Sequence, residues 1–360
     1  MKTRKTLIHA TILMALAMST SSYAGSVNEK LYDLHKRVQE LESSQTGSNS
    51  NIQIHGVVEA EYGYTQDVDY TLADTSDIVL ATVELVIDAK VNNNVDVQVA
   101  LLYEEDDTPL EVDSGIIMMH DDNLPLTLSM GQMYVPFGVY ESNMISDPLT
   151  LELGETRESA VQLSFESNGA TAGLYVFNGD VEEGLDEDKV TQFGIALGFG
   201  NDNFSVGVDY ISAISDTDAV QDFLGVPAII KQVAGISAHA VYNTDAMSMI
   251  VEYVGALDKF DASEIVFNGN GAQPAAANVE FGFNFPVAGR DSTVAIGYQV
   301  TEEAWDLGLP ESRAMIAFSM GLYEATSLSF EYLSDSDYEP VDGGSGESSS
   351  TFTVQLAAEF

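Results

Sequence analysis

The chain of 360 residues contains no cysteine, has a single tryptophan and is poor in basic residues. Without cysteine it can form neither a disulfide framework nor a thiolate metal site. Beyond residue 24 no apolar run reaches 18 residues, which excludes a helical membrane protein. Lys and Arg total 13 against 57 Asp and Glu, for a net charge of −44. This charge excludes nucleic acid as a partner and attracts cations, although an acidic surface also serves solubility in salt-adapted bacteria.

The first 24 residues have the pattern of a secretory signal peptide. Lys2, Arg4 and Lys5 precede an apolar stretch over 7–18, and residues 22–24 follow the small-x-small rule for cleavage. The apolar stretch is too short for a spanning helix. We therefore predict a signal peptide over residues 1–24 and export from the cytoplasm.

Residues 25–42 have apolar side chains at alternating spacings of four and three, which predicts a periplasmic helix with a heptad seam. The seam positions are Val27, Leu31, Leu34, Val38 and Leu41. Because isolated helices of this length are marginal in water, we expect the segment to need a partner. A coiled coil joining a homotrimer is one arrangement, and packing against the mouth of a barrel is the other. Residues 43–51, rich in Ser and Asn, predict a flexible linker.

Residues 52–360 alternate apolar and polar side chains in segments that end at turn residues, which predicts β-strands. Every second connection is short and contains Asn, Asp or Gly, and the others are mostly longer. Short turns on one side and long loops on the other are typical of an outer-membrane barrel. We predict an all-β, closed antiparallel transmembrane barrel of 16 strands, in which lipid contacts the outer face. The predicted strands are 52–64, 78–91, 95–104, 110–120, 124–134, 159–167, 170–178, 190–200, 203–213, 233–243, 246–255, 275–286, 291–301, 312–321, 325–334 and 350–360.

The last predicted strand has apolar residues at every second position and ends on Phe360. It resembles the carboxy-terminal signal of bacterial outer-membrane barrels; the alternative is a half-buried strand of a soluble sandwich. Seven of the eight predicted strands that run outward finish on tyrosine, which predicts an interfacial belt. The tyrosines are Tyr64, Tyr103, Tyr134, Tyr210, Tyr253, Tyr298 and Tyr332. The same register predicts a lipid face that includes Val79, Ala81, Val83, Leu85 and Ile87.

The opposite face of the strands is polar and acidic, and we expect it to face the lumen. Carboxylates in a wet pore favour cations over anions. The alternative is that the acids pair with Lys90, Arg290 or Arg313 and hold the shape of the barrel. The predicted lumenal residues are His55, Glu59, Glu61, Glu84, Asp88, Asp96, Gln98, Asp209, Glu252, Glu280 and Glu331.

The long connection 135–158 is predicted to fold into the pore as a constriction loop. Its leucines at 149, 151 and 153 would add little stability to a loop exposed to water, but they can pack on the inner wall of the barrel. We expect Asp147, Glu152, Glu155 and Arg157 to lie at the narrow point. Arg157 is predicted to pair with Glu155 or Glu158, or to contact a carboxylate of a solute.

No cofactor, metal site or catalytic group is predicted. The acidic stretch 104–107 with Glu111 and Asp113, and the stretch 180–188, could bind a hard cation, but neither has the spacing of a calcium loop, so solvated loops are the favoured interpretation. The histidines lack a zinc spacing. A barrel of the phospholipase type would need an outward-facing Ser and His, whereas His239 is expected in the lumen.

Three segments resemble one family. The run from Ile78 to Glu105, the run 134–138 (Tyr-Val-Pro-Phe-Gly) and the run 147–156 are similar to the LbtU-type siderophore porins, outer-membrane barrels related to the legiobactin receptor. The resemblance implies uptake of a ferric siderophore without a plug domain. An acidic lumen opposes a polycarboxylate siderophore, so two alternatives stay open: a general cation-selective diffusion porin, and a non-conducting surface barrel whose loops bind a partner.

Overall fold

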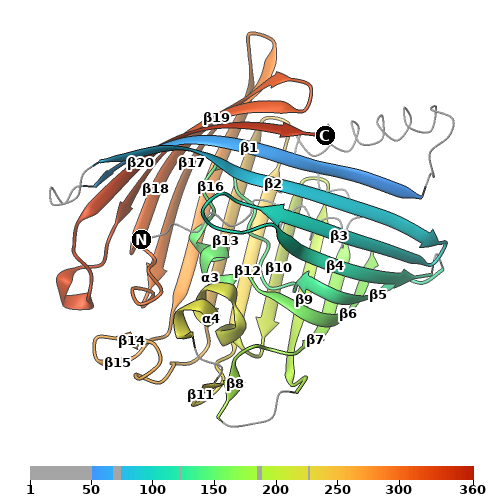
Figure 1. Ribbon diagram of the computed structural model, residues 1–360, viewed down its shortest axis with the longest axis horizontal. Helices are drawn as coiled ribbons and strands as arrows, with labels where there is room; N and C mark the ends of the chain where they lie inside the picture. Colours follow the sequence, from blue (N-terminus) through green and yellow to red (C-terminus); the bar gives the residue numbers. More distant parts are fainter. Residues whose placement is uncertain (1–50, 68–73, 122, 185–188, 226–227) are drawn as a thin grey trace.

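The computed structural model describes residues 51–67, 74–121, 123–184, 189–225 and 228–360. Sixteen antiparallel strands form a closed barrel (Figure 1). Each predicted strand is present, and no boundary moves by more than three residues. The barrel strands are β1 (Ile52–Asp67), β2 (Thr75–Asn92), β3 (Val95–Tyr103), β4 (Glu111–His120), β5 (Leu126–Tyr134), β6 (Arg157–Ser167), β7 (Ala170–Phe177), β9 (Gln192–Asn201), β10 (Phe204–Ile211), β12 (Gly235–Asn243), β13 (Met247–Ala256), β16 (Ala275–Val287), β17 (Arg290–Glu302), β18 (Ser312–Tyr323), β19 (Thr326–Ser336) and β20 (Ser348–Glu359).

The first and last strands close the barrel. β1 pairs with β20 in antiparallel register from Val57 opposite Glu359 to Asp67 opposite Ser349. Gly56 and Phe360 also exchange backbone hydrogen bonds of 3.0 Å in both directions. The carboxy-terminal strand is therefore a seam strand, and the alternative of an open soluble sandwich is wrong.

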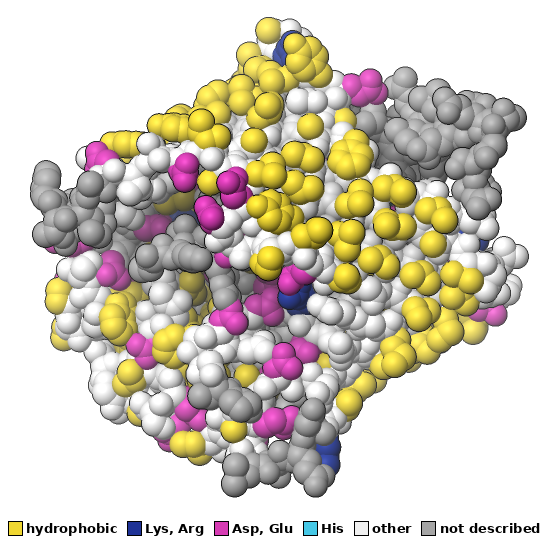
Figure 2. All heavy atoms as spheres, viewed as in Figure 1, with side chains coloured by type: hydrophobic (Ala, Val, Ile, Leu, Met, Phe, Trp, Pro, Cys, Tyr) yellow, Lys and Arg dark blue, Asp and Glu magenta, His cyan; other side chains and the backbone are white. Residues whose placement is uncertain are grey.

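Side chains alternate between an apolar outer face and a polar inner face. On β16, Phe283 and Phe285 are 47% and 41% exposed on the outside, whereas Glu280 and Asn278 are fully buried. Apolar side chains spread over the outer wall where β1 to β4 lie (Figure 2). Such a surface is costly in water and suits a lipid environment.

The predicted lipid face is wrong at the start of β2. Thr82 pairs with Glu59 but Leu80 pairs with Ala60, so Ala81 forms a bulge between them. A bulge places two residues opposite one and reverses the alternation beyond it. Ala81 is consequently buried, and Val79 shares the inner face of its partner Glu61.

The tyrosine belt is present with one exception. Tyr64, Tyr253, Tyr298 and Tyr332 are 36% to 56% exposed on the outer face, and two others are half-buried there. Tyr134 is buried instead, and its hydroxyl donates a 2.7 Å hydrogen bond to Asp113. The prediction failed because alternation breaks after a glycine.

That glycine is Gly131 in β5. It has a φ of 146°, and a Cβ there would lie 1.9 Å from the carbonyl oxygen of Gly115. Only glycine accepts this approach. Beyond it both Met133 and Tyr134 are buried, so Tyr134 points into the barrel.

The long connections pack together at one end of the barrel. They contain the short elements β8 (Glu182–Glu183), β11 (Ala228–Ile229), β14 (Val266–Phe267), β15 (Asn270–Gly271), η1 (Ile214–Asp216), α4 (Asp218–Leu224) and η2 (Pro340–Asp342). The predicted signal peptide, the heptad helix and residues 43–50 of the linker lie outside the described residues, so the trimer through the heptad positions stays a prediction. Among the described residues, no helix has the length and apolarity needed to cross a bilayer.

Candidate functional site: an acidic constriction

The connection from β5 to β6 folds into the barrel. Its short helix α3 (Leu149–Gly154) lies inside the wall (Figure 1). Leu149, Leu151 and Leu153 are at most 1% exposed and belong to one core cluster with Phe137 and Tyr175. Apolar burial of this extent contributes roughly 1.5–3 kcal/mol per leucine. The prediction that these leucines pack on the inner wall is confirmed.

The backbone of this loop is bound to acidic side chains of the wall. Asp209 on β10 accepts a hydrogen bond from the backbone N–H of Gly138 at 3.0 Å, and Glu252 on β13 accepts from those of Val139 and Tyr140 at 2.7 and 3.1 Å. A loop buried in a barrel must satisfy its N–H groups. These two acids satisfy the three consecutive N–H groups of residues 138–140.

Two further acids continue this pattern along the wall. Glu280 on β16 accepts from the Ser142 hydroxyl at 2.8 Å and from the backbone N–H of Asn143 at 2.7 Å. Glu331 on β19 accepts from the backbone N–H groups of Ile145 and Ser146 at 2.6 and 3.2 Å. The loop is therefore attached to the wall from β10 to β19.

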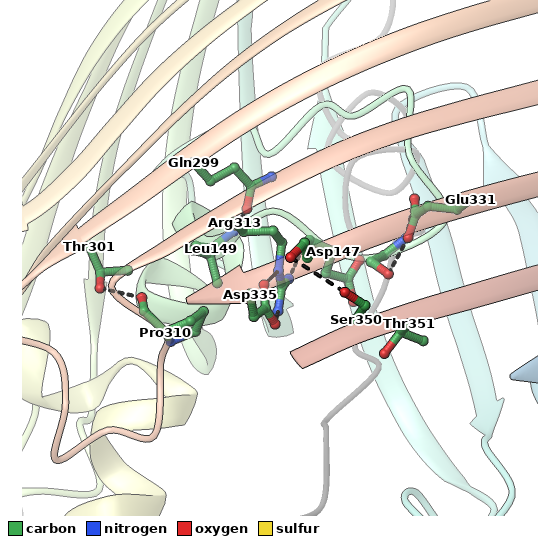
Figure 3. Close-up of polar contacts among 12 residues, drawn as sticks. Asp147, Leu149, Gln299, Thr301, Pro310, Arg313, Glu331, Asp335, Ser350 and Thr351 are labelled. Atoms are coloured by element: carbon green, nitrogen blue, oxygen red, sulfur yellow. Dashed lines mark hydrogen bonds and ion pairs between the residues drawn. The ribbon is translucent and has the colours of Figure 1, made fainter. Parts of the chain in front are cut away.

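Figure 3 shows the start of helix α3 and the contacts of Arg313 that hold the loop beside it. The first N–H groups of a helix have no partner within it. Here the side-chain oxygen of Gln299 accepts a hydrogen bond from the backbone N–H of Leu149 at 2.9 Å. Arg313 donates from Nε and Nη2 to the two oxygens of Asp335 at 2.8 and 3.0 Å, and from Nη1 to the carbonyl oxygen of Asp147. Arg313 thus faces the inside of the barrel and pairs with an acid of the neighbouring strand.

The other half of the wall presents acids toward the loop. We use the term acidic constriction for this set: Asp147, Glu152 and Glu155 on the loop, and Glu59, Glu84, Glu104 and Asp113 on or beside strands β1 to β4. Acidic side chains surround the hollow in the middle of the molecule (Figure 2). All of these wall acids are less than 9% exposed.

The electrostatics show that loop and wall acids act on one another. Burial raises the pKa of Asp147 well above its usual range, the negative charges of Glu152 and Glu104 add to the rise, and Arg313 opposes it. Burial likewise raises the pKa of Glu104 to about 7, with contributions from Asp107 and Asp113. These acids therefore take up protons more readily than exposed carboxylates, and the charge of the site depends on pH near neutrality.

Arg157, at the start of β6, is held by partners that differ from those predicted. Its Nη1 lies 2.6 Å from Glu111 and 3.3 Å from Asp113. The predicted pair with Glu155 or Glu158 is wrong, because the Arg157 side chain reaches across β5 to the acids of β4. Glu111 and Asp113 were interpreted as solvated loop acids, yet Asp113 is fully buried within β4.

We predict that Arg157→Ala lowers the free energy of unfolding by about 3 kcal/mol, because removing one partner of a buried ion pair leaves an uncompensated charge on Asp113. The measurement is the thermal unfolding midpoint of the folded barrel in detergent. Lys231→Ala is the matched control, since Lys231 pairs with Asp258 at 2.7 Å but both side chains are 63% exposed, and such pairs contribute about 0–1 kcal/mol. Equal losses in the two variants would contradict the prediction.

The remaining predicted residues lie elsewhere on the inner wall. Glu61 on β1 accepts a hydrogen bond from Gln355 of β20 at 2.9 Å. Asp88 and Asp96 lie toward the end of the barrel that has short turns, where Asp88 contacts His55 at 3.0 Å and Asp96 lies 3.5 Å from His120. The structure thus separates these two aspartates from the loop.

Sequence reasoning missed Glu104, Asp113, Asp335 and Gln299. Glu104 and Asp113 were assigned to a solvated stretch because runs of acids usually lie in loops. Register offers a partial signal, since Asp335 pairs directly with Arg313 on the neighbouring strand. No three His, Asp or Glu residues in the described ranges are placed to hold a metal ion.

Sequence comparison finds relatives among the UPF0422 proteins. The UPF0422 proteins of Legionella pneumophila strains Lens and Paris are 29% and 31% identical to this chain over 327 and 290 residues, which cover 79% and 73% of it. A UPF0422 protein of Coxiella burnetii is 30% identical over 224 residues, or 59% of the chain. The chain spans 62%, 55% and 48% of the lengths of these relatives. No family model matches.

Structural comparison finds outer-membrane porins. The outer-membrane channel DcaP of Acinetobacter baumannii superposes with a TM-score of 0.63 at 15% identity, over 87% of this chain and 99% of the channel. An anion-selective porin from Comamonas acidovorans gives 0.60 at 12% identity, over 86% and 99%. At these identities the likeness shows a shared fold, a 16-stranded porin-like barrel, and leaves function to the side chains.

Proposed function

We propose that this protein is an outer-membrane porin that passes small solutes and favours cations. One observation carries the proposal: a closed barrel holds an inserted loop that is fixed to one half of its wall and presents acids to an acidic other half. Charged rings in a wet pore set ion selectivity. The anion-selective neighbour has the same fold, so the sign of selectivity depends on the residues that line each pore.

Ferric-siderophore uptake is the finer form of this proposal. Its support is the resemblance of residues 78–105, 134–138 and 147–156 to siderophore porins. The acidic constriction favours a neutral or cationic chelate over a polycarboxylate one. Growth of a deletion strain on ferric chelates of each charge tests this form, and unchanged uptake of every chelate would remove it while leaving the porin function standing.

Recording from the purified protein in planar bilayers tests the porin function itself. We expect discrete channels with a reversal potential that favours K⁺ over Cl⁻. A silent barrel would favour the alternative of a non-conducting surface protein, and a channel without cation preference would contradict the role of the acidic constriction.

Cation preference is predicted to rise between pH 5 and pH 9. A carboxyl whose pKa is raised is neutral below that pKa and charged above it, and burial raises the pKa of Glu104 to about 7 and that of Asp147 well above its usual range. Reversal potentials in a salt gradient at several pH values measure the effect. A flat profile over this range would mean that these acids do not act on the permeating ion.

A further inference from the structure

Four large apolar side chains are exposed on the long connections at one end of the barrel. Ile230 is 62% exposed, Val266 37%, Trp305 38% and Val341 81%. They come from four connections: Ile230 follows β11, Val266 lies in β14, Trp305 lies between β17 and β18, and Val341 lies in η2. Single exposed apolar residues are common on protein surfaces, whereas a group of them marks an interaction site. The contacts between the connections show that these four form a group.

Hydrogen bonds join the first three side chains across their connections. The backbone N–H of Ile230 donates to the carboxylate of Glu264, two residues before Val266. The backbone N–H of Val266 donates to the carboxylate of Asp306, the residue after Trp305, at 2.7 Å. Ile230, Val266 and Trp305 therefore follow one another along the surface.

The fourth side chain adjoins Trp305. A Cβ added at Gly343 would lie 3.1 Å from the ring of Trp305, and Gly343 comes directly after η2, which contains Val341. The side chain of Asn268, which follows β14, also donates to Asp342 at 2.6 Å. The four residues are thus neighbours on linked connections. We use the term outer ridge for Ile230, Val266, Trp305 and Val341.

The connections around the outer ridge are acidic. Residues 257–274, 302–311 and 337–347 contain eleven Asp and Glu but only one Lys. That base, Lys259, lies 3.6 Å from Glu303, and Lys231, beside Ile230, lies 2.7 Å from Asp258. Acidic and apolar side chains are interspersed on the face where β14 and β15 lie (Figure 2). The outer ridge is therefore an apolar surface in a negative field.

This field determines which partner the outer ridge fits. A second copy of the chain would bring the same acids into the contact, and an anionic lipid or polysaccharide surface would be repelled for the same reason. We propose that the outer ridge is a docking surface for a basic amphipathic segment of another protein, in which apolar side chains lie beside lysine or arginine. The apolar side chains would cover Trp305 and its neighbours, and the bases would face the surrounding acids. Such binding needs no passage of ions and is independent of the porin function.

Fluorescence tests the inference, because Trp305 is the only tryptophan of the chain and reports on the outer ridge directly. The probe is an amphipathic helical peptide of leucine and lysine, added to the full-length protein in discs of zwitterionic lipid. We expect a saturable blue shift of the Trp305 emission, with a Kd about tenfold or more below that of a serine–lysine or a leucine–glutamate peptide. Equal affinity of the serine–lysine peptide would mean that charge alone explains binding, and equal affinity of the leucine–glutamate peptide that apolar contact alone does. Either result, or no saturable shift, would overturn the inference.

Serine variants locate the docking surface and leave the tryptophan reporter in place. Ile230→Ser with Val341→Ser is expected to raise the Kd of the leucine–lysine peptide about tenfold, since both side chains would be buried in the contact. Leu110→Ser is the control, because Leu110 is 70% exposed in the connection before β4, outside the outer ridge, and it should leave the Kd unchanged. Unaltered binding in the double variant, or an equal loss in the control, would contradict the assignment. Channel recordings of the same variants should match the wild type, so failure of this inference leaves the porin function standing.

Discussion

The variant Glu152→Lys is expected to lower the permeability ratio of K⁺ to Cl⁻ roughly tenfold. Glu152 lies in the first turn of α3 and is partly exposed. The substitution changes the charge of this loop residue by two units. At an effective dielectric constant near 20, a unit charge 4 Å away contributes about 4 kcal/mol, and less at longer range. A tenfold change in the permeability ratio needs only about 1.4 kcal/mol in the relative energy of the two ions. Reversal potentials in a KCl gradient measure it.

Controls separate a local effect from one of net charge. Glu347→Lys makes the same change of charge at an exposed outer position and should leave the ratio unaltered, because water and salt screen it. Asp147→Lys should act in the same direction as Glu152→Lys. If both loop variants keep the wild-type ratio, the loop does not lie at the narrow point.

The fold could be predicted from the sequence because two patterns agree. Side-chain alternation defined each strand, and Asn, Asp and Gly at every second connection set the order of short and long loops. The errors came where one local residue altered the backbone. The bulge at Ala81 turned Val79 inward, and Gly131 broke the alternation before Tyr134. A bulge has no reliable pattern in a single sequence, so neither error could be avoided by closer counting.

The functional site was harder to predict from the sequence than the fold, for a physical reason. Alternation predicts which face a side chain occupies but not what lies against it. Glu59 and Glu280 have the same signal in sequence, yet Glu280 accepts hydrogen bonds from the loop, whereas Glu59 faces it from the opposite half of the wall. The distinction depends on the path of residues 135–156. That path is set by long-range packing of three leucines and by wall acids up to 186 residues away in sequence.

The attachment of the loop explains why an acidic barrel can be stable with few bases. Carboxylates of the wall accept backbone N–H groups, which are dipoles and add no charge. A carboxylate that accepts two or three such bonds is stabilised in its ionised form. Glu280 and Glu331 therefore have a structural use as hydrogen-bond acceptors for the loop that does not require Lys or Arg.

The double variant Glu280→Ala with Glu331→Ala is predicted to release the loop. Together these acids accept bonds from the Ser142 hydroxyl and from the backbone N–H groups of Asn143, Ile145 and Ser146. Each lost bond to a charged group costs about 1.5–3 kcal/mol, and the exposed N–H groups would draw water behind the loop. We expect a larger and noisier single-channel conductance, weaker cation preference and a lower unfolding temperature in detergent.

A second double variant distinguishes the effect of releasing the loop from the effect of losing charge. Glu280→Gln with Glu331→Gln removes both charges but keeps one acceptor oxygen on each side chain, so the loop should hold and conductance should stay near the wild-type value. If the glutamine and alanine variants conduct alike, charge rather than attachment governs the current. If neither differs from the wild type, the leucine core of α3 alone is sufficient to fix the loop, and the wall carboxylates on that half are dispensable for the shape of the pore.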